Sequence, residues 1–165
     1  MMNKKGFFVD YIIYIVFLFI FGIVFISAFY IQSNINSGIQ NSTEVPTESK
    51  TVLGNWTNRF NIVFDWTYVT IFIGLLIAVV LAATMMNAHP AVVGISIIIM
   101  IIFGGIAVYL SNAFYGFASS SGMASSSNSF SLTPLIMQNL PIIAILFMVI
   151  FIVILYAKSR SSSPI

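Results

Sequence analysis

The sequence predicts an all-α integral membrane protein with four transmembrane helices, a central helical hairpin and two polar loops on the non-cytoplasmic side. Mean hydropathy is +1.05 and only 6% of residues are charged, a composition that requires lipid rather than water around its outer faces. Four apolar runs are each long enough to cross a hydrocarbon core: residues 7–31, 62–85, 91–111 and 134–157. The 165 residues are therefore expected to form one membrane domain.

The first apolar run, residues 7–31, follows a short basic tail that contains Lys4 and Lys5. A secretory signal peptide also begins with basic residues, but its apolar region has only about 7–15 residues. Because this run is much longer and no convincing cleavage site follows it, we interpret it as an uncleaved first span.

The central hairpin is predicted from the short joint between the second and third runs, Met85-Met86-Asn87-Ala88-His89-Pro90. This short joint leaves room for a tight reversal only. Pro90 suits the first position of the third helix, because proline lacks the N–H that would be unsatisfied there. His89, the only histidine, is interpreted as a turn residue at the level of the lipid headgroups.

Small side chains recur on one side of each arm of this hairpin. Small residues let helix backbones approach closely inside a membrane, where helices gain little from hydrophobic burial. The two arms are therefore expected to pack on each other through these residues: Gly74, Ala78, Ala82, Gly104, Ala107 and Ser111.

The two polar segments, residues 32–61 and 112–133, are expected to be loops that carry the contacts with partner proteins. Specific recognition needs groups that hydrogen-bond outside the hydrocarbon, and the spans offer only packing surfaces. The apolar anchors expected at these contacts are Trp56, Phe114, Tyr115 and Phe117. Asn41 and Asn55 each begin a glycosylation acceptor pattern, and whether either is modified stays open.

The fourth span is predicted to begin with Thr133 as its N-cap and Pro134 in its first turn. Pro141 should kink this helix, because it cannot donate to the carbonyl one turn earlier. Gln138 and Asn139 lie close enough in sequence to help satisfy the backbone groups that the kink exposes.

Topology follows from the positions of the basic residues. Positive residues collect on the cytoplasmic side of a membrane, and four spans bring both tails to the same side. Four of the six lie in the tails and two lie in the first polar segment: Lys4, Lys5, Lys158 and Arg160 against Lys50 and Arg59. Both termini are therefore expected to be cytoplasmic, or in the virion interior if the membrane is that of a virus.

The residue types that carry chemistry are scarce. No span has an ionisable residue near its middle, which argues against pumps and coupled transporters. Asp10 and Asp65 stand at the ends of spans, as interfacial carboxylates or as contacts within the bundle. The chain has no cysteine, and its single histidine lacks metal-binding partners. We expect no enzyme, no catalytic, cofactor or metal site, and no nucleic-acid partner.

The order of several short motifs resembles that of small membrane proteins of tailless icosahedral phages and viruses that contain a membrane. The resemblance covers residues 60–160 and rests on His89-Pro90, Ser111-Asn112-Ala113-Phe114, Met137-Gln138-Asn139-Leu140-Pro141 and the short basic end. It implies a structural role in a virion, in a lipid vesicle beneath a capsid whose proteins touch the loops. It assigns no functional residue.

Two functions are weighed on this basis. The first is a structural membrane protein of a larger assembly, whose partners are the lipid bilayer and other membrane or capsid proteins, with homo-oligomerisation as a further option. The alternative is a small pore-forming or holin-like protein. The polar residues within the spans are scattered rather than aligned on one face, which favours the structural role.

Overall fold

The computed structural model describes residues 7–85 and 90–161, without the side chains of residues 7–12, 82, 90–93 and 161. Nearly all of this chain is helical. In order, the helices are α1 (Phe7–Asn41), α2 (Thr47–Met85), α3 (Pro90–Ala118), α4 (Ala124–Asn128), α5 (Leu132–Gln138) and α6 (Leu140–Ser161). The predicted turn at His89 lies outside the described residues.

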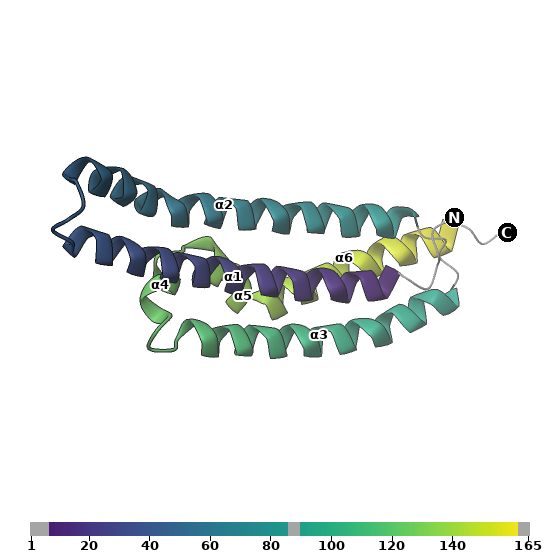
Figure 1. Ribbon diagram of the computed structural model, residues 1–165. Coiled ribbons are helices and arrows are strands. Elements are labelled where there is room, and N and C mark those ends of the chain that lie inside the picture. Colours follow the sequence, from purple (N-terminus) through teal and green to yellow (C-terminus); the bar gives the residue numbers. More distant parts are fainter. Residues whose placement is uncertain (1–6, 86–89, 162–165) are drawn as a thin grey trace.

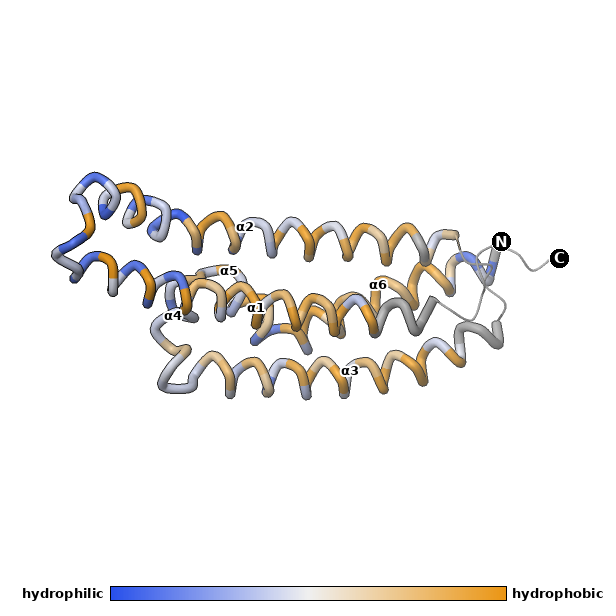
Figure 2. The backbone as a smooth tube through the Cα atoms, in the orientation of Figure 1, coloured by the Kyte–Doolittle hydropathy of each residue, from blue (hydrophilic) through white to orange (hydrophobic). Residues whose placement is uncertain are grey.

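Four of these helices, α1, α2, α3 and α6, are long and apolar enough to span a membrane, which confirms the predicted fold class. They run up and down the bundle, so that α1 begins and α6 ends at the end where α2 passes into α3 (Figure 1). Apolar residues dominate all four along most of their length, and hydrophilic residues gather at the two ends of the bundle (Figure 2).

The two arms of the central hairpin do not pack on each other as the small residues predict. The close helix pairs are α1 with α2 and α3 with α6, completed by α1 with α3 and α2 with α6. Helices α2 and α3 therefore lie across the diagonal of the bundle, with α1 and α6 between them (Figure 1). Large buried side chains of α1 and α6, such as Leu18 and Phe151, lie in the hydrophobic clusters between the two arms.

Both polar segments, which were predicted to be loops, are largely helical. Helix α1 continues ten residues past the predicted end of its span, to Asn41, and α2 begins at Thr47, so only residues 42–46 connect them. At a rise of about 1.5 Å per residue, α1 and α2 are about 52 Å and 58 Å long, against about 30 Å of hydrocarbon. The second segment holds the end of α3, the short helix α4 and the start of α5.

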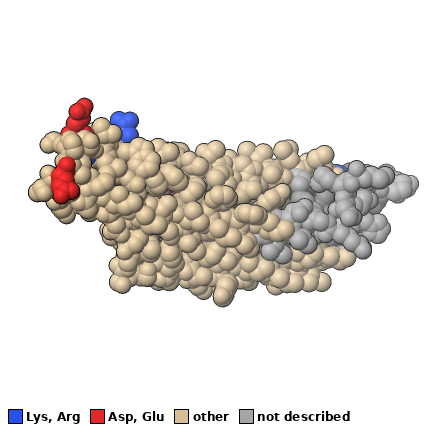
Figure 3. All heavy atoms as spheres, in the orientation of Figure 1, with Lys and Arg blue, Asp and Glu red and all other residues tan. Residues whose placement is uncertain are grey.

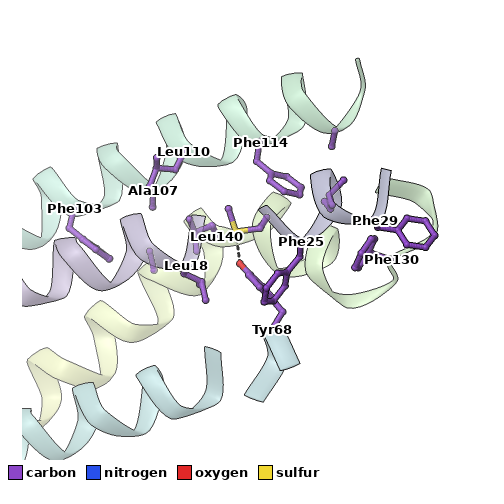
Figure 4. Packing of buried hydrophobic residues seen from close by; sticks show 14 of the residues in the cluster. Leu18, Phe25, Phe29, Tyr68, Phe103, Ala107, Leu110, Phe114, Phe130 and Leu140 are labelled. Atoms are coloured by element: carbon purple, nitrogen blue, oxygen red, sulfur yellow. Dashed lines mark hydrogen bonds between the residues drawn. The ribbon is translucent and has the colours of Figure 1, made fainter. Parts of the chain in front are cut away.

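The core of the bundle is built from large side chains that meet between α1, α3 and the α5–α6 region (Figure 4). Ile26, Tyr68, Phe114 and Met137 are fully buried there. The Tyr68 hydroxyl donates to the Met137 sulfur at 2.7 Å, so its polar atom is satisfied inside the core. Gly22 of α1 is also buried beside these groups, and a Cβ at this position would come within 3.5 Å of the Tyr68 ring.

Aromatic residues mark the level where the hydrocarbon ends at the α4 side of the bundle. Trp66 is 62% exposed and Tyr109 is 72% exposed. Each lies about 19 residues, or about 28 Å, from the end of its helix at the opposite side, close to the thickness of a hydrocarbon core. Exposed Trp and Tyr side chains collect at membrane interfaces, so we place the membrane boundary at this level.

At the opposite end of the bundle, a basic residue joins the ends of two helices. The Lys158 ammonium, in the last turn of α6, donates to the backbone carbonyl of Thr84 at the end of α2. A cation near the C-terminal end of a helix is favourable, because unpaired carbonyls carry partial negative charge there.

Candidate functional site

Asp65 is the only buried charged side chain among the residues that the structure describes, with 6% of its surface exposed. It lies on α2 at the membrane boundary and binds the beginning of α5. Its Oδ2 accepts the backbone N–H groups of Ser131 and Leu132, each at 2.8 Å. Its Oδ1 accepts the N–H of Thr133 at 2.6 Å and the Thr133 hydroxyl at 2.7 Å. One side chain thus joins α2 to the α4–α5 segment.

The local sequence explains why a distant carboxylate is needed. The first N–H groups of a helix have no partner within the helix and are usually capped by a nearby side chain. Helix α5 begins at Leu132 with Ser131 as its N-cap, two residues earlier than the sequence predicts, and the Ser131 side chain makes no capping bond. Pro134 has no N–H, so Asp65 accepts all three N–H groups of residues 131–134.

The kink predicted at Pro141 is an interruption of the helix at Asn139, with α5 ending at Gln138 and α6 beginning at Leu140. Side-chain donors pair with backbone carbonyls at this point. The Asn139 amide donates to the Leu135 carbonyl at 2.7 Å. The Ser111 hydroxyl of α3 donates to the Gln138 carbonyl at 2.9 Å, which joins α3 to the break. Short helix α5 is therefore held at both ends by polar side chains.

One turn above Asp65, Asn61 makes a second link between α2 and the α4–α5 connection. Its Nδ2 donates to the Ser129 carbonyl at 2.6 Å. Its Oδ1 is buried and has no donor among the described residues. A cavity of about 270 Å³ lies at this place, and it is lined by Asn61, Ile62, Asp65, Trp66, Ser129, Ser131 and Leu132.

Aromatic rings surround this region on the inner side, where α1 and α2 leave the membrane. The Phe60 and Phe64 rings stack with centroids 4.1 Å apart, and Phe25 meets Phe64 edge-on at 4.7 Å. Phe29 meets Phe130 edge-on at 5.5 Å, so the α4–α5 connection also packs on α1 (Figure 4). The base of the protruding helices is thus rigidly packed.

Beyond this base, α1 and α2 form a helical projection, residues 32–60. Its inner contacts are polar: the Gln32 amide donates to the Thr57 hydroxyl at 3.3 Å, and the Gln40 amide donates to the Lys50 carbonyl at 2.8 Å. The Lys50 ammonium donates to the carbonyls of Gln40 and Ser42, at 3.0 and 2.5 Å. These bonds join the two helices, and none of residues 32–59 belongs to a buried hydrophobic cluster.

The charged residues of the projection include both acidic and basic side chains. Figure 3 shows the acidic side chains at its tip, a basic group nearby, and no charged side chain across the middle of the face in view. Glu44 and Glu48 are exposed at the tip, and Arg59 is exposed near the base of the projection. This pattern separates a water-facing end from a lipid-facing body.

The small residues predicted to pack are divided between two environments. Gly74 and Ala78 of α2 are exposed on the outside of the bundle, and a Cβ on Gly74 would meet nothing within 4 Å. Their exposure corrects the prediction that they contact α3; the side chain of Ala82 is outside the described residues. On α3 the three small residues face inward: a Cβ on Gly104 would lie 3.1 Å from the Met148 Cε, and Ala107 and Ser111 are buried.

The residues predicted as partner contacts are also divided. Trp56 and Tyr115 are 53% and 61% exposed, and Phe117 is half-buried against the core. Phe114 is fully buried inside the bundle, so it is not available to a partner, which corrects that assignment. Helix α3 continues through Phe114 as a packed helix, whereas the sequence analysis placed this residue in a loop.

Sequence reasoning missed the inner contacts of the projection and the role of Asp65. A signal for the projection exists: Phe25, Phe29, Gln32, Asn36 and Gln40 recur at spacings of three and four, the pattern of one helix face. For Asp65 the weaker signal is a first turn at residues 131–134 with a proline and no acidic residue. That turn needs an acceptor from elsewhere, but nothing in the sequence selects Asp65.

Comparison with known protein families, with curated proteins and with solved structures found no match. The class of the protein therefore rests on its fold. Four long apolar helices, a band of exposed aromatic residues and polar ends make this chain an integral, multi-pass helical membrane protein. No group of three or more His, Cys, Asp and Glu residues that could hold a metal ion occurs in residues 7–85 and 90–161.

Proposed function

We propose that this chain is a non-enzymatic structural protein of a larger membrane-containing assembly, and that its helical projection contacts neighbouring proteins. The observation that carries the proposal is the projection itself. Helix α2 extends about 27 Å beyond the membrane boundary at Asp65, at about 1.5 Å per residue. It exposes Val52 and Trp56 where no lipid covers them, and exposed tryptophan is typical of residues that anchor protein interfaces.

The proposed setting is a virion membrane. The resemblance to small membrane proteins of tailless, membrane-containing phages supports it, and so does the shape of the molecule. A protein that fastens a membrane to a shell needs a rigid element that crosses the headgroup layer. A projection held by hydrogen bonds such as Gln32–Thr57 and packed at its base by Phe29 and Phe60 is such an element.

The buried carboxylate supports the non-enzymatic part of the proposal. A general base needs a free lone pair directed at its substrate. Asp65 accepts four hydrogen bonds, which uses the approximately four acceptor positions of a carboxylate. Its role in the proposal is to hold α5 on α2.

A pore-forming or holin-like function finds less support. A cavity between α1, α2 and α6 measures about 30 Å³ and is lined by apolar side chains such as Leu18, Phe72 and Leu140. A space of this size holds about two water molecules.

Truncation of the projection tests the proposal. Residues 34–55 are replaced by a short Gly/Ser turn, which keeps the Gln32–Thr57 contact and the aromatic base. Particles assembled with this variant in place of the wild-type chain are expected to lose it from their membrane, while the variant still inserts into the membrane in cells. Quantification of the chain in purified particles measures the effect. Incorporation at the wild-type level would contradict the proposal.

A further inference from the structure

The cavity beside Asp65 and Asn61 lies at the depth of lipid headgroups. Two of its lining residues, Ile62 and Trp66, are 56% and 62% exposed on the outer surface of α2. The same face of α2 continues toward the opposite membrane surface with exposed Ile73 and Ile77, which face acyl chains. A lipid molecule on this face would place its headgroup next to the cavity.

The chemistry of the cavity is that of a site for a hydrogen-bond donor with positive charge. Asn61 donates through Nδ2 to the Ser129 carbonyl, which fixes the orientation of the amide and leaves Oδ1 as an acceptor with no donor in the described part of the chain. A buried acceptor of this kind is costly unless it is paired. The four donors to Asp65 are neutral groups, so dipoles alone offset its negative charge.

We propose that this cavity binds the ethanolamine headgroup of a membrane phospholipid. The ammonium group donates N–H bonds into the cavity at Asn61 beside the Asp65 carboxylate. The phosphate lies on the acyl-chain side of the cavity, and an acyl chain lies along Ile73 and Ile77. A choline headgroup has the positive charge but no N–H, and a glycerol headgroup has hydroxyl donors but no positive charge. The inference depends on membrane embedding alone and stands apart from the assembly role proposed above.

Native mass spectrometry of the full-length protein in detergent tests this site. The probes are phosphatidylethanolamine, its N-methyl and N,N-dimethyl derivatives, phosphatidylcholine and phosphatidylglycerol, all with identical acyl chains. We expect binding to weaken as methyl groups replace N–H donors. Phosphatidylcholine and phosphatidylglycerol should bind about tenfold more weakly than phosphatidylethanolamine, the effect of about one charge-assisted hydrogen bond. Equal affinities across the series would overturn the proposal.

Substitutions test whether the preference for phosphatidylethanolamine arises at this cavity. Asn61→Leu is expected to lower the affinity for phosphatidylethanolamine at least several-fold. Asn55→Leu is the matched control, because it makes the same change at an exposed asparagine of the same helix that does not line the cavity, and it should leave the lipid preference unchanged. A preference that survives Asn61→Leu in folded protein would place the lipid elsewhere and overturn the assignment.

Discussion

Asp65→Ala is expected to destabilise the protein by about 2–4 kcal/mol. The substitution removes the acceptor of three backbone N–H groups and one hydroxyl, and an unpaired buried polar group costs about 1–3 kcal/mol. The expected destabilisation is smaller than the summed cost of three unpaired buried N–H groups, because water can reach the part-buried N–H groups of Ser131 and Leu132. Unfolding of the purified protein in detergent by heat or by SDS measures it.

Two comparisons make this prediction specific. Glu48→Ala removes an exposed acidic residue of the same helix and should change stability by less than about 0.5 kcal/mol, as surface substitutions usually do. Hydrogen exchange should rise in Asp65→Ala at residues 131–138, where α5 loses its attachment to α2. An Asp65→Ala protein as stable as Glu48→Ala would contradict the structural role of the carboxylate.

Ala107→Leu is expected to destabilise the bundle by about 1–3 kcal/mol, whereas Ala78→Leu should be neutral. Ala107 is fully buried in the core, so a larger side chain forces its neighbours apart. Ala78 is exposed on α2, where an added isobutyl group meets lipid. The two substitutions make the same chemical change in two small-residue stripes that are alike in sequence, so the comparison isolates burial.

Both variants are measured by the same detergent unfolding assay. Equal effects would mean that the outward face of α2 is packed against another chain in the preparation. A neutral Ala107→Leu together with a disruptive Ala78→Leu would restore direct packing of the hairpin arms and contradict the diagonal arrangement of α2 and α3.

The spans were predictable because hydrophobicity is a property of the residues themselves. A run such as residues 140–157 must lie in lipid whatever its neighbours are. Which helices touch was not predictable from the small residues, because close packing depends on the shape of the partner. Gly74 and Gly104 have the same side chain, yet one faces outward and the other lies against Met148.

The polar segments were misassigned for a related reason. Residues such as Gln32 and Gln40 lower hydropathy and suggest a loop, but on a helix face they can hydrogen-bond to a second helix. The capping of α5 by Asp65 could not be derived, because the partners are separated by 66 to 68 residues. Only the folded arrangement brings this carboxylate to the first turn of α5.

The most direct test of the proposed role is photocrosslinking in the native assembly. p-Benzoylphenylalanine is introduced at Trp56, on the projection, and at Ile77, on the lipid-facing side of the same helix. We predict a protein adduct from position 56, identified by mass spectrometry as one defined neighbour, and lipid adducts alone from position 77. Lipid adducts alone from both positions would contradict the claim that the projection is a protein contact.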